Sequence, residues 1–289
     1  MQEKYTQKDK DEIRPRISKD KFRIMQELYD LEIEKKGEIG HKRFNAEGRH
    51  LVLGCMHVPF HNKKMLTSIL NLLQSVEFSG LHLIGDFMDL NTFSFHDRGK
   101  FPAQIGLTYA SEMKDGNYVL DLLTRAHDFN DMSYVWGNHE DRFKRFYSDM
   151  ENAKRPLQSP TEELHLRDRG FAVHEDWSRD YVMLGKHLQL HHGQFCGIHT
   201  AKMHMDRLRH SNMFAHTHRI QHYIEGRMGS YNIGFGGDIN SPAFNYMPRA
   251  TKSTWQNGAA VVTLDKDGDY FVEQLTFINN HFVYGGKIY

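Results

Sequence analysis

The sequence has few of the features that mark secreted, membrane-spanning or generally nucleic-acid-coating proteins. Its 289 residues include only 2 cysteines and 7 prolines, so a disulfide framework is excluded as the basis of the fold. No run approaches the roughly 20 apolar residues that cross a bilayer. The opening stretch, MQEKYTQKDKDEIRPR, lacks the apolar core of a secretory signal. We therefore expect a cytoplasmic protein that does not enter a membrane.

Charge of one sign is also lacking, because 37 Lys and Arg residues balance 37 Asp and Glu residues to a formal net charge of +0. Without an overall positive field, non-specific coating of nucleic acid is disfavoured, although a local groove stays open. Internal repeats and low-complexity tracts are absent too. What the sequence does contain is histidine, 20 residues in all, several of them clustered with Gly, Asp and Asn.

The first part of the chain differs in composition from the rest. Residues 1–47 are rich in Lys, Glu, Asp and Arg, and an approximate helical stripe of apolar residues runs through 20–36. We predict a charged N-terminal extension with one amphipathic helix, followed by a single domain over 48–289. The helix either packs on that domain or contacts a partner, for example a second copy of the chain in a homo-oligomer.

The first half of the predicted domain alternates strands with helices. Short apolar runs at 50–54, 80–85 and 132–136 each end at or beside a glycine, which is typical of buried strands. Helical spacing of apolar residues covers 65–76 and 109–129. Such alternation predicts an α/β sheet whose functional loops lie at the carboxyl ends of the strands.

The second half is richer in strands. Residues 181–184 and 187–190 flank a Gly-Lys turn, 212–214 form a short apolar run, and 259–264 pair with 270–273 across a turn rich in Asp and Gly. Two sheets that face each other, with helices on the outside, fit this order of elements best. The predicted fold class is therefore an α/β/β/α sandwich.

Five short clusters carry the side chains that bind metal ions, and most follow a predicted strand. They are GCMH at 54–57, GDFMD at 85–89, GNHE at 137–140, HHG at 191–193 and AHTH at 215–218. Carboxylate, amide and imidazole groups recur on separate loops, as a site for two hard-to-borderline metal ions requires. In the fourth cluster His191 and His192 would point to opposite faces of a strand. We select His192 as the ligand and treat His191 as structural.

The order of these clusters resembles that of the calcineurin-like metallophosphoesterases. The first cluster corresponds to an Asp-x-His motif, the second and third match Gly-Asp-x-x-Asp and Gly-Asn-His-Glu, the fourth contains His-Gly, and the last corresponds to Gly-His-x-His. Further stretches (HVPFH at 57–61, NHEDR at 138–142, HTHR at 216–219 and YGGK at 284–287) are similar to a branch common in bacteriophages and prokaryotes, which would place the protein in the host cytoplasm if it is phage-encoded. The resemblance implies a four-layer α/β/β/α sandwich and hydrolysis of phosphomonoesters or phosphodiesters, including nucleotides or nucleic acid, by a metal-activated water.

The resemblance also implies a role for each residue. One divalent ion would be held by Cys55, His57, Asp86 and His218, and a second ion by Asp86, Asn138, His192 and His216. His139 would act on the leaving-group oxygen as general acid or charge stabiliser, and Asp89 would orient His139. Arg142 and Arg219 are predicted phosphate contacts, because a guanidinium group fits phosphate oxygens.

Two positions depart from the family pattern. Ala215 stands where the family usually has glycine, which is a minor change. Cys55 replaces the aspartate of the first motif. A cysteine thiolate would favour Zn²⁺ or iron over Mg²⁺ or Mn²⁺ at the first position. A buried thiol that binds nothing would instead leave that position weak or empty.

Three functions therefore compete. The first is a phosphoesterase with two divalent metal ions, drawn from Mn²⁺, Zn²⁺, iron and Mg²⁺. The second is a degenerate protein of the same fold that binds a nucleotide or a partner with weak or no catalysis, because Cys55 replaces the aspartate. The third is a nuclease of this fold assisted by the N-terminal helix, which the neutral net charge disfavours.

Overall fold

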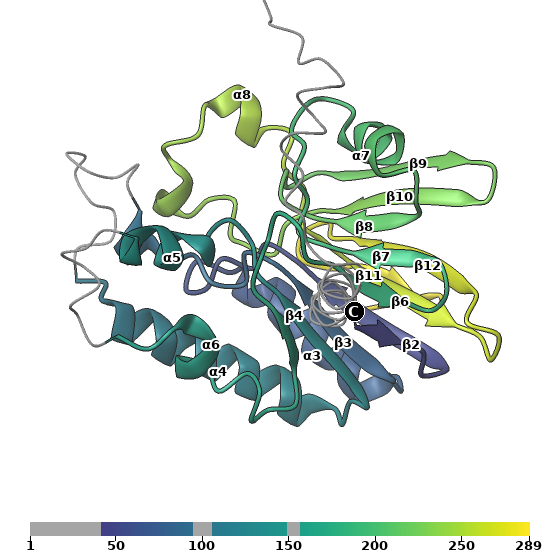
Figure 1. Cartoon of the computed structure of the whole chain (residues 1–289), viewed down its shortest axis with the longest axis horizontal. Coiled ribbons are helices and arrows are strands. Elements are labelled where there is room, and N and C mark those ends of the chain that lie inside the picture. Colours follow the sequence, from purple (N-terminus) through teal and green to yellow (C-terminus); the bar gives the residue numbers. More distant parts are fainter. Residues whose placement is uncertain (1–41, 95–105, 149–156) are drawn as a thin grey trace, which may run out of the picture. The chain divides into compact units, whose positions relative to one another are not determined.

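The computed structural model describes residues 42–94, 106–148 and 157–289 (Figure 1). The helix predicted over 20–36 lies outside the described residues, as does most of the predicted extension, so both stay predictions. Residues His41–Tyr289 form one compact unit. Its first described strand, β1 (Arg43–Phe44), pairs in parallel with β6 (Val182–Leu184) and thus lies inside the range predicted as extension.

The predicted α/β class with facing sheets is confirmed. Sheet I has the order β12-β11-β2-β3-β4-β5. Its parallel strands are β2 (Gly48–Leu53), β3 (Gly80–Ile84), β4 (Asp131–Val135) and β5 (Ala172–His174), and its antiparallel strands are β11 (Gly258–Leu264) and β12 (Tyr270–Thr276). The connections from β2 to β3 and from β3 to β4 carry α3 (Lys63–Ser75) and α4 (Tyr109–Ala126).

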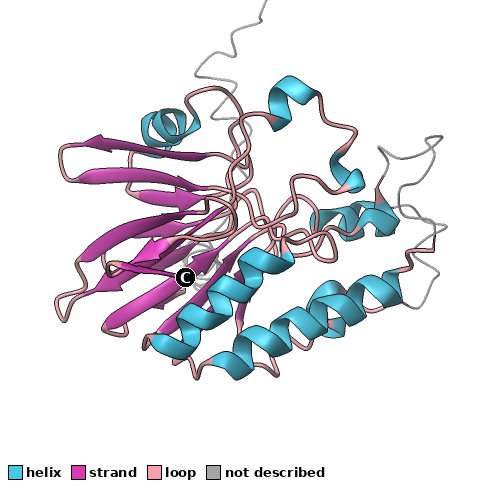
Figure 2. Cartoon of the chain, turned by 180° about the vertical axis from the view of Figure 1, so that it is seen from behind, coloured by secondary structure: helices cyan, strands magenta, loops and turns pink. Residues whose placement is uncertain are grey.

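Sheet II has the order β1-β6-β7-β8-β10-β9. It continues from β6 through β7 (Leu188–Leu190) and β8 (Asn212–Phe214) to β10 (Met228–Ile233) and the edge strand β9 (Ile220–Glu225). The helix α7 (Thr200–Leu208) packs on β9 and β10. Figures 1 and 2 show α3 and α4 against sheet I and α7 on the opposite side of the molecule, which gives the predicted order of layers.

Shorter elements fill the loops between these layers. After β3 the chain makes a 3₁₀ turn, η1 (Asn91–Phe93), and after β4 it makes α5 (Asp141–Tyr147) and α6 (Pro160–Glu163). The turn η3 (Pro242–Phe244) and α8 (Arg249–Lys252) follow β10, and the hairpin of β13 (Val283–Tyr284) and β14 (Lys287–Ile288) ends the chain. Among the described residues no helix is both long and apolar enough to span a bilayer.

Alternation along the central strands divides the core into two clusters. On β2, Leu51 and Leu53 belong to the cluster beneath α3 and α4, whereas Val52 belongs to the cluster between the sheets. Neighbouring Leu83 and Ile84 of β3 divide in the same way. Each such fully buried side chain contributes about 1.5–3 kcal/mol to folding. A strand buried on both faces reads as a continuous apolar run, which is why the sequence marks β2, β3 and β4 clearly.

The helix ends follow local capping. The side chain of Asn62 accepts from the backbone N–H groups of Lys64 and Met65 at the start of α3, and Thr108 and Ser111 form a reciprocal capping box at the start of α4. The prediction that the second helix extends to residue 129 was wrong, because α4 ends at Ala126. The next residue, His127, is extended, and its ring bonds the backbone of Phe78 instead.

A chain of hydrogen bonds crosses the interior far from the strand tips. The ring of His50 contacts the Ala46 carbonyl (2.8 Å) and His82 (3.0 Å), and His82 contacts the Ser133 hydroxyl (2.8 Å). The chain is self-consistent when both imidazoles are neutral, because each ring then donates once and accepts once. Burial lowers the pKa of His50, and burial together with the neighbouring His50 holds the pKa of His82 well below its ordinary value.

Candidate metal centre

The loops after the parallel strands meet at one edge of sheet I and are joined there by backbone hydrogen bonds. The N–H of Cys55 donates to the Gly85 carbonyl (2.9 Å), and the N–H of His57 donates to the Asp86 carbonyl (2.9 Å). A side chain on Gly137 would collide with the Asp86 carboxylate, and one on Gly85 would collide with the His192 ring. Glycine therefore permits the close approach that brings these loops together.

Unusual backbone conformations concentrate at this edge. Five of the predicted ligands have positive φ although none is glycine: Cys55 (49°), His57 (51°), Asp86 (49°), His216 (50°) and His218 (59°). Such a residue costs on the order of 1–3 kcal/mol, and clusters of them mark functional sites. The surrounding structure therefore holds these side chains in directions that an unstrained loop would not give.

Four of the predicted second-ion ligands converge on one point. The Nε2 atom of His192 lies 2.9 Å from Asn138 Oδ1, 3.3 Å from Asp86 Oδ2 and 3.1 Å from His216 Nδ1. The other ring nitrogen of His192 faces the Ile84 carbonyl (3.2 Å) and must donate to it. In a neutral ring Nε2 then carries a lone pair that faces oxygen acceptors. A proton on Nε2, or a cation among these atoms, resolves the conflict.

The charge state of His192 reflects this conflict. Burial acts to lower the pKa of His192, but the Asp86 carboxylate outweighs burial and the pKa is raised. His216 behaves oppositely, since burial and the neighbouring His192 lower the pKa of its ring to about 3. A metal ion bound here would take the place of the His192 proton.

The predicted first-ion ligands form a second group beside the first. The Nδ1 atom of His57 donates to Asp89 Oδ1 (2.9 Å), so its Nε2 lone pair faces Nε2 of His218 at 3.2 Å. Burial lowers the pKa of both rings. The neighbouring His139 lowers the pKa of His57 further, and His57 lowers the pKa of His218 further. The ligand atoms of Cys55, His57 and His218 all lie within 4.8 Å of one another.

Cys55 lies between the two groups. It is buried, and its sulfur also falls within 4.8 Å of ligand atoms of Asp86 and His192. The backbone N–H of His216 donates to this sulfur (3.1 Å). Burial raises the pKa of the Cys55 thiol well above its ordinary value, and the Asp86 charge raises it further. Without a nearby cation the side chain is therefore a thiol, whereas a dication would favour the thiolate.

Asp86 is the group that the two halves share. Its Oδ2 atom lies 3.3 Å from His192, 3.9 Å from His57 and 3.9 Å from His139, and its Oδ1 atom accepts the backbone N–H of His139 (2.8 Å). Burial acts to raise the pKa of the Asp86 carboxyl, but the surrounding imidazoles outweigh it and hold the pKa well below the ordinary range. The carboxylate thus stays charged.

The spacing of these atoms suits metal binding. Two neighbouring ligand atoms each about 2.0–2.1 Å from one ion lie about 2.8–3.0 Å apart in octahedral geometry and about 3.3–3.4 Å apart in tetrahedral geometry. The contacts of His192 with Asn138, Asp86 and His216, and that of His57 with His218, span 2.9–3.3 Å. Imidazole, amide and carboxylate groups at these distances fit a pair of divalent ions, with the softer Cys55 on one side.

His139 and Asp89 lie beside the ligands. The Nδ1 atom of His139 contacts both the carbonyl (2.9 Å) and the carboxylate (3.1 Å) of Asp89. Burial opposes ionisation of Asp89, but His139, His57 and Arg142 outweigh it and hold its pKa far below the ordinary range. Asp89 therefore orients two rings, His139 and His57, where the sequence predicted only the first.

The two predicted phosphate contacts differ in position. Arg142 is buried and donates to the Asp89 carbonyl (2.9 Å), with its second Nη atom 3.1 Å from Nε2 of His139. Arg219 lies on the wall of a cavity of about 280 Å³ that also contains Asp86, His139 and His216, and it donates to Thr254 (2.9 Å) and to the Gly197 carbonyl. Their role in binding phosphate stays a prediction.

Glu140 has a structural role that sequence reasoning missed. It is fully buried and accepts from the N–H groups of Asp86 (3.0 Å), Met88 (2.9 Å) and Gly137 (2.8 Å) and from the Tyr134 hydroxyl (2.8 Å). One carboxylate thereby fixes the loops after β3 and β4 relative to each other. The available signal was its place directly after His139 in the third cluster.

Three other groups complete the surroundings. The ring of His191 stacks on Phe214, and its structural role stays a prediction. Phe235 and Trp255 pack against His218 with ring centroids 4.2 and 4.3 Å away. The exposed thiol of Cys196 lies 3.4 Å from Nε2 of His216, a contact that the sequence did not suggest.

Comparisons with known proteins give similarity of fold. No protein-family model and no curated protein sequence matches the chain. Among solved structures it is similar to zinc-bound Vps29 from Entamoeba histolytica (14% identity, TM-score 0.40, covering 80% of this chain and 99% of that chain). It is also similar to a predicted phosphoesterase from Streptococcus pneumoniae (15% identity, TM-score 0.36, covering 84% and 97%). Vps29 from Chaetomium thermophilum gives 13% identity, a TM-score of 0.40 and coverage of 80% and 97%.

Proposed function

We propose that the protein is a metal-dependent phosphoesterase that hydrolyses phosphomonoesters or phosphodiesters. The observation that carries this proposal is the position of Asp86, whose buried carboxylate lies between two groups of potential ligands with His139 next to it. A shared carboxylate with imidazole and amide groups on both sides is the donor set of a two-ion site. When bound, two divalent ions would activate water and offset the charge of the phosphoryl group.

The protein's own residues would position the reaction. Asp89 accepts from Nδ1 of His139 and so leaves Nε2 directed at the Asp86 side of the site. A proton on that nitrogen could be given to the leaving-group oxygen, which is general acid catalysis. Arg142 would donate to the same nitrogen once His139 has given up its proton. Arg219, on the cavity wall, would contact a phosphate oxygen.

The direct test is hydrolysis of p-nitrophenyl phosphate and bis-p-nitrophenyl phosphate by the full chain with Mn²⁺, Zn²⁺, Fe²⁺ or Mg²⁺. We expect activity with at least one metal and a loss of about 10²–10⁴-fold in kcat for His139→Ala. Because His139 is not among the proposed ligands, the metal content of that variant should be unchanged. Absence of turnover on both esters with every metal would contradict the proposal.

The p-nitrophenyl esters test for hydrolysis in general and do not identify the natural substrate. Nucleotides and nucleic acid are included in the proposal because both are phosphate esters, and a nuclease stays possible in this fold. Digestion of single- and double-stranded DNA at low salt tests the nuclease, since contacts to the phosphate backbone weaken as salt rises. Mononucleotides as substrates under the same conditions separate a nucleotidase from a nuclease.

A degenerate binding protein is the second candidate, and Cys55 is the observation that favours it. Its thiol is buried, it already accepts a hydrogen bond from His216, and its pKa is raised by burial. These features weaken a cation site that needs a charged ligand. Such a protein would bind a nucleotide or a partner through the same fold without turnover.

Metal content separates the two candidates. Two ions per chain in the wild-type protein, with activity, support the phosphoesterase. One ion or none in the wild type, with two ions and new activity in Cys55→Asp, supports the binding protein. A serine at position 55 is the matched control, because it keeps the size of the side chain but cannot supply a charge.

A further inference from the structure

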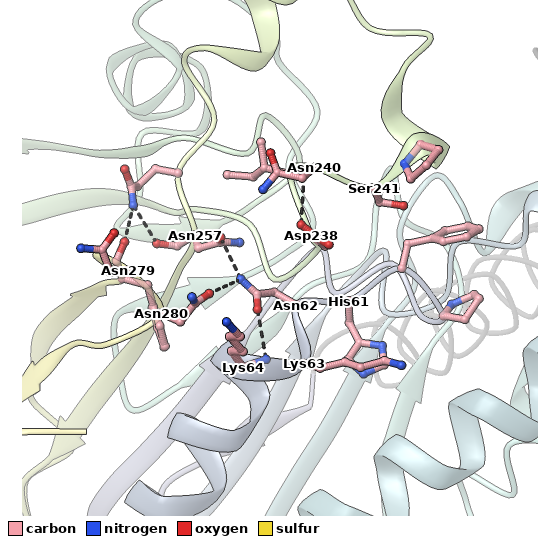
Figure 3. Close-up of a pocket in the computed structure, with 16 residues that line it drawn as sticks. His61, Asn62, Lys63, Lys64, Asp238, Asn240, Ser241, Asn257, Asn279 and Asn280 are labelled. Carbon is pink, nitrogen blue, oxygen red and sulfur yellow. Dashed lines mark hydrogen bonds between the residues drawn. The ribbon is translucent and has the colours of Figure 1, made fainter. Parts of the chain in front are cut away.

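A second cavity, of about 770 Å³, lies beside the loop that continues from the first ligand cluster (Figure 3). Its walls come from residues 59–64, which lead into α3, from 238–242 after β10, and from residues 256, 257, 277, 279 and 280. The ring of Phe60 lines it and packs against Phe244, which in turn packs against His57. An aromatic wall thus separates this cavity from the metal centre.

The cavity is held open by backbone hydrogen bonds between its walls. The N–H of Asn62 donates to the Gly236 carbonyl (2.9 Å), and the N–H of Asp238 donates to the Phe60 carbonyl (2.7 Å). The volume falls within the roughly 300–1,000 Å³ typical of small-molecule sites. A ligand would therefore enter a shape that is already formed, with little ordering cost.

Amide side chains dominate the lining, and three of them build the floor. Asn62 donates to Asn257 (3.2 Å) and to Asn280 (2.8 Å), as Figure 3 shows. Asn257 donates in turn to the carbonyls of Phe235 (2.7 Å) and Gly237 (2.8 Å). These bonds explain why asparagine occupies the floor. They also use most of the donors of Asn62 and Asn257, so these amides have few left for a ligand.

Other polar groups of the lining are not used in this way. Asn240, Asn279, Lys63 and Lys64 are exposed, and among the described residues their side chains form no hydrogen bond or ion pair. Asp238 spends one carboxylate oxygen on the N–H of Asn240. Two lysines against one aspartate give the lining a charge of about +1 at neutral pH.

We propose that this cavity binds a nucleoside phosphate. The two ammonium groups suit a phosphate, and neutral amides that can both donate and accept suit the edge of a base and the ribose hydroxyls. The half-buried ring of Phe60 supplies apolar surface for a flat ring. Asn279 and Asn280 lie in the turn between the bridged residues Ile278 and His281, and the turn explains their positive φ. No such turn explains why Asn240 and the two lysines line the cavity.

The test is titration of the full chain with AMP, adenosine, ribose 5-phosphate and inorganic phosphate, followed by calorimetry or ligand NMR. EDTA is present, so that binding at the metal centre and hydrolysis do not contribute. This proposal is therefore independent of the proposed activity. We expect AMP to bind at least about 10-fold more tightly than adenosine, ribose 5-phosphate or inorganic phosphate. No AMP binding up to about 5 mM, or equal affinity for AMP and inorganic phosphate, would overturn the proposal.

Variants locate the binding. Replacing both lysines (Lys63→Gln with Lys64→Gln) should weaken AMP binding about 10-fold and leave adenosine binding within about 2-fold. Asn240→Ala and Asn279→Gly should weaken AMP and adenosine alike by about 5-fold. Glycine at 279 is compatible with the positive φ there, so the loss of the amide is separated from backbone strain. Lys266→Gln, in the exposed turn between β11 and β12, is the control; binding that ignores all cavity variants would overturn the assignment.

Discussion

The two halves of the metal centre are built from different chemistry. Around His192 the partners are the Asp86 carboxylate, the Asn138 amide and the His216 imidazole, and the pKa of His192 is raised. Around His57 the partners are His218 and the Cys55 thiol, and the pKa of both rings is lowered. The Asp86 carboxylate reaches both groups, but the second group adds an amide to its two imidazoles, whereas the first adds the Cys55 thiol. The cysteine therefore makes the two groups of potential ligands unequal.

The most damaging change should be Asp86→Asn, because it removes the only carboxylate within reach of both groups of described ligands. We expect both ions to be lost and kcat to fall about 10³-fold or more. The measurement is metal analysis alongside ester hydrolysis. Asp267→Asn, in an exposed turn, is the control. Retention of two ions in Asp86→Asn would show that the halves do not share this residue.

Glu140→Gln should weaken the His192 half by releasing its loops. The four donors that meet the carboxylate cannot all be satisfied by an amide, whose own NH₂ group would face N–H groups. We expect a loss of about 2–4 kcal/mol in the free energy of unfolding. Urea denaturation measures this loss, with Glu225→Gln on the edge strand β9 as control. An unchanged unfolding midpoint would mean that the loops are fixed by other contacts.

Cys55→Asp should make the two halves alike. We expect the affinity of the first position for Mn²⁺ to rise about 10–100-fold, and its preference for Zn²⁺ over Mn²⁺ to fall, because an oxygen ligand replaces sulfur. Competitive metal titration of wild type, Cys55→Asp and Cys55→Ser gives the comparison. Equal Mn²⁺ affinity in all three proteins would mean that residue 55 does not bind an ion.

The smallest expected effect is on the pH dependence of stability, through two buried histidines that lie outside the candidate metal centre. His50 and His82 have lowered pKa values in the fold, so the unfolded chain binds more protons than the folded chain below pH 6.5. The free energy of unfolding should therefore fall as the pH drops below about 6.5, by at most about 1.4 kcal/mol per pH unit for each ring. Denaturation in EDTA between pH 8 and pH 5 measures the slope. His82→Leu should reduce the slope.

The sequence was most informative where burial and chemistry coincide. The strands β2, β3 and β4 are apolar on both faces and end near glycine, so both the strands and the ligand loops could be predicted. The edge strand β9 was not predicted, because its side chains are mostly exposed or half-buried and show little alternation. The helix α7 was also missed, since its short and largely polar sequence gives a weak apolar stripe.

The backbone conformation of the ligand loops and the contacts between distant residues could not be predicted from the sequence. Positive φ at Asp86 and His218 has only a weak signal in residue type, since Asp and His adopt it more often than most residues but still rarely. The second partner of Asp89, the bonds of Glu140 to Asp86 and Met88, and the approach of Cys196 to His216 join residues 20 or more positions apart in the chain. The asparagine-lined cavity likewise combines segments separated by more than one hundred residues, as Asn62 and Asn257 illustrate.

Anomalous scattering from crystals grown with Mn²⁺ or Zn²⁺ tests the central claim most directly. The account predicts two peaks, one on each side of the Asp86 carboxylate, with the first near His57 and His218 and the second near Asn138, His192 and His216. A single peak distant from Asp86, or no peak at full soaking concentration, would contradict it.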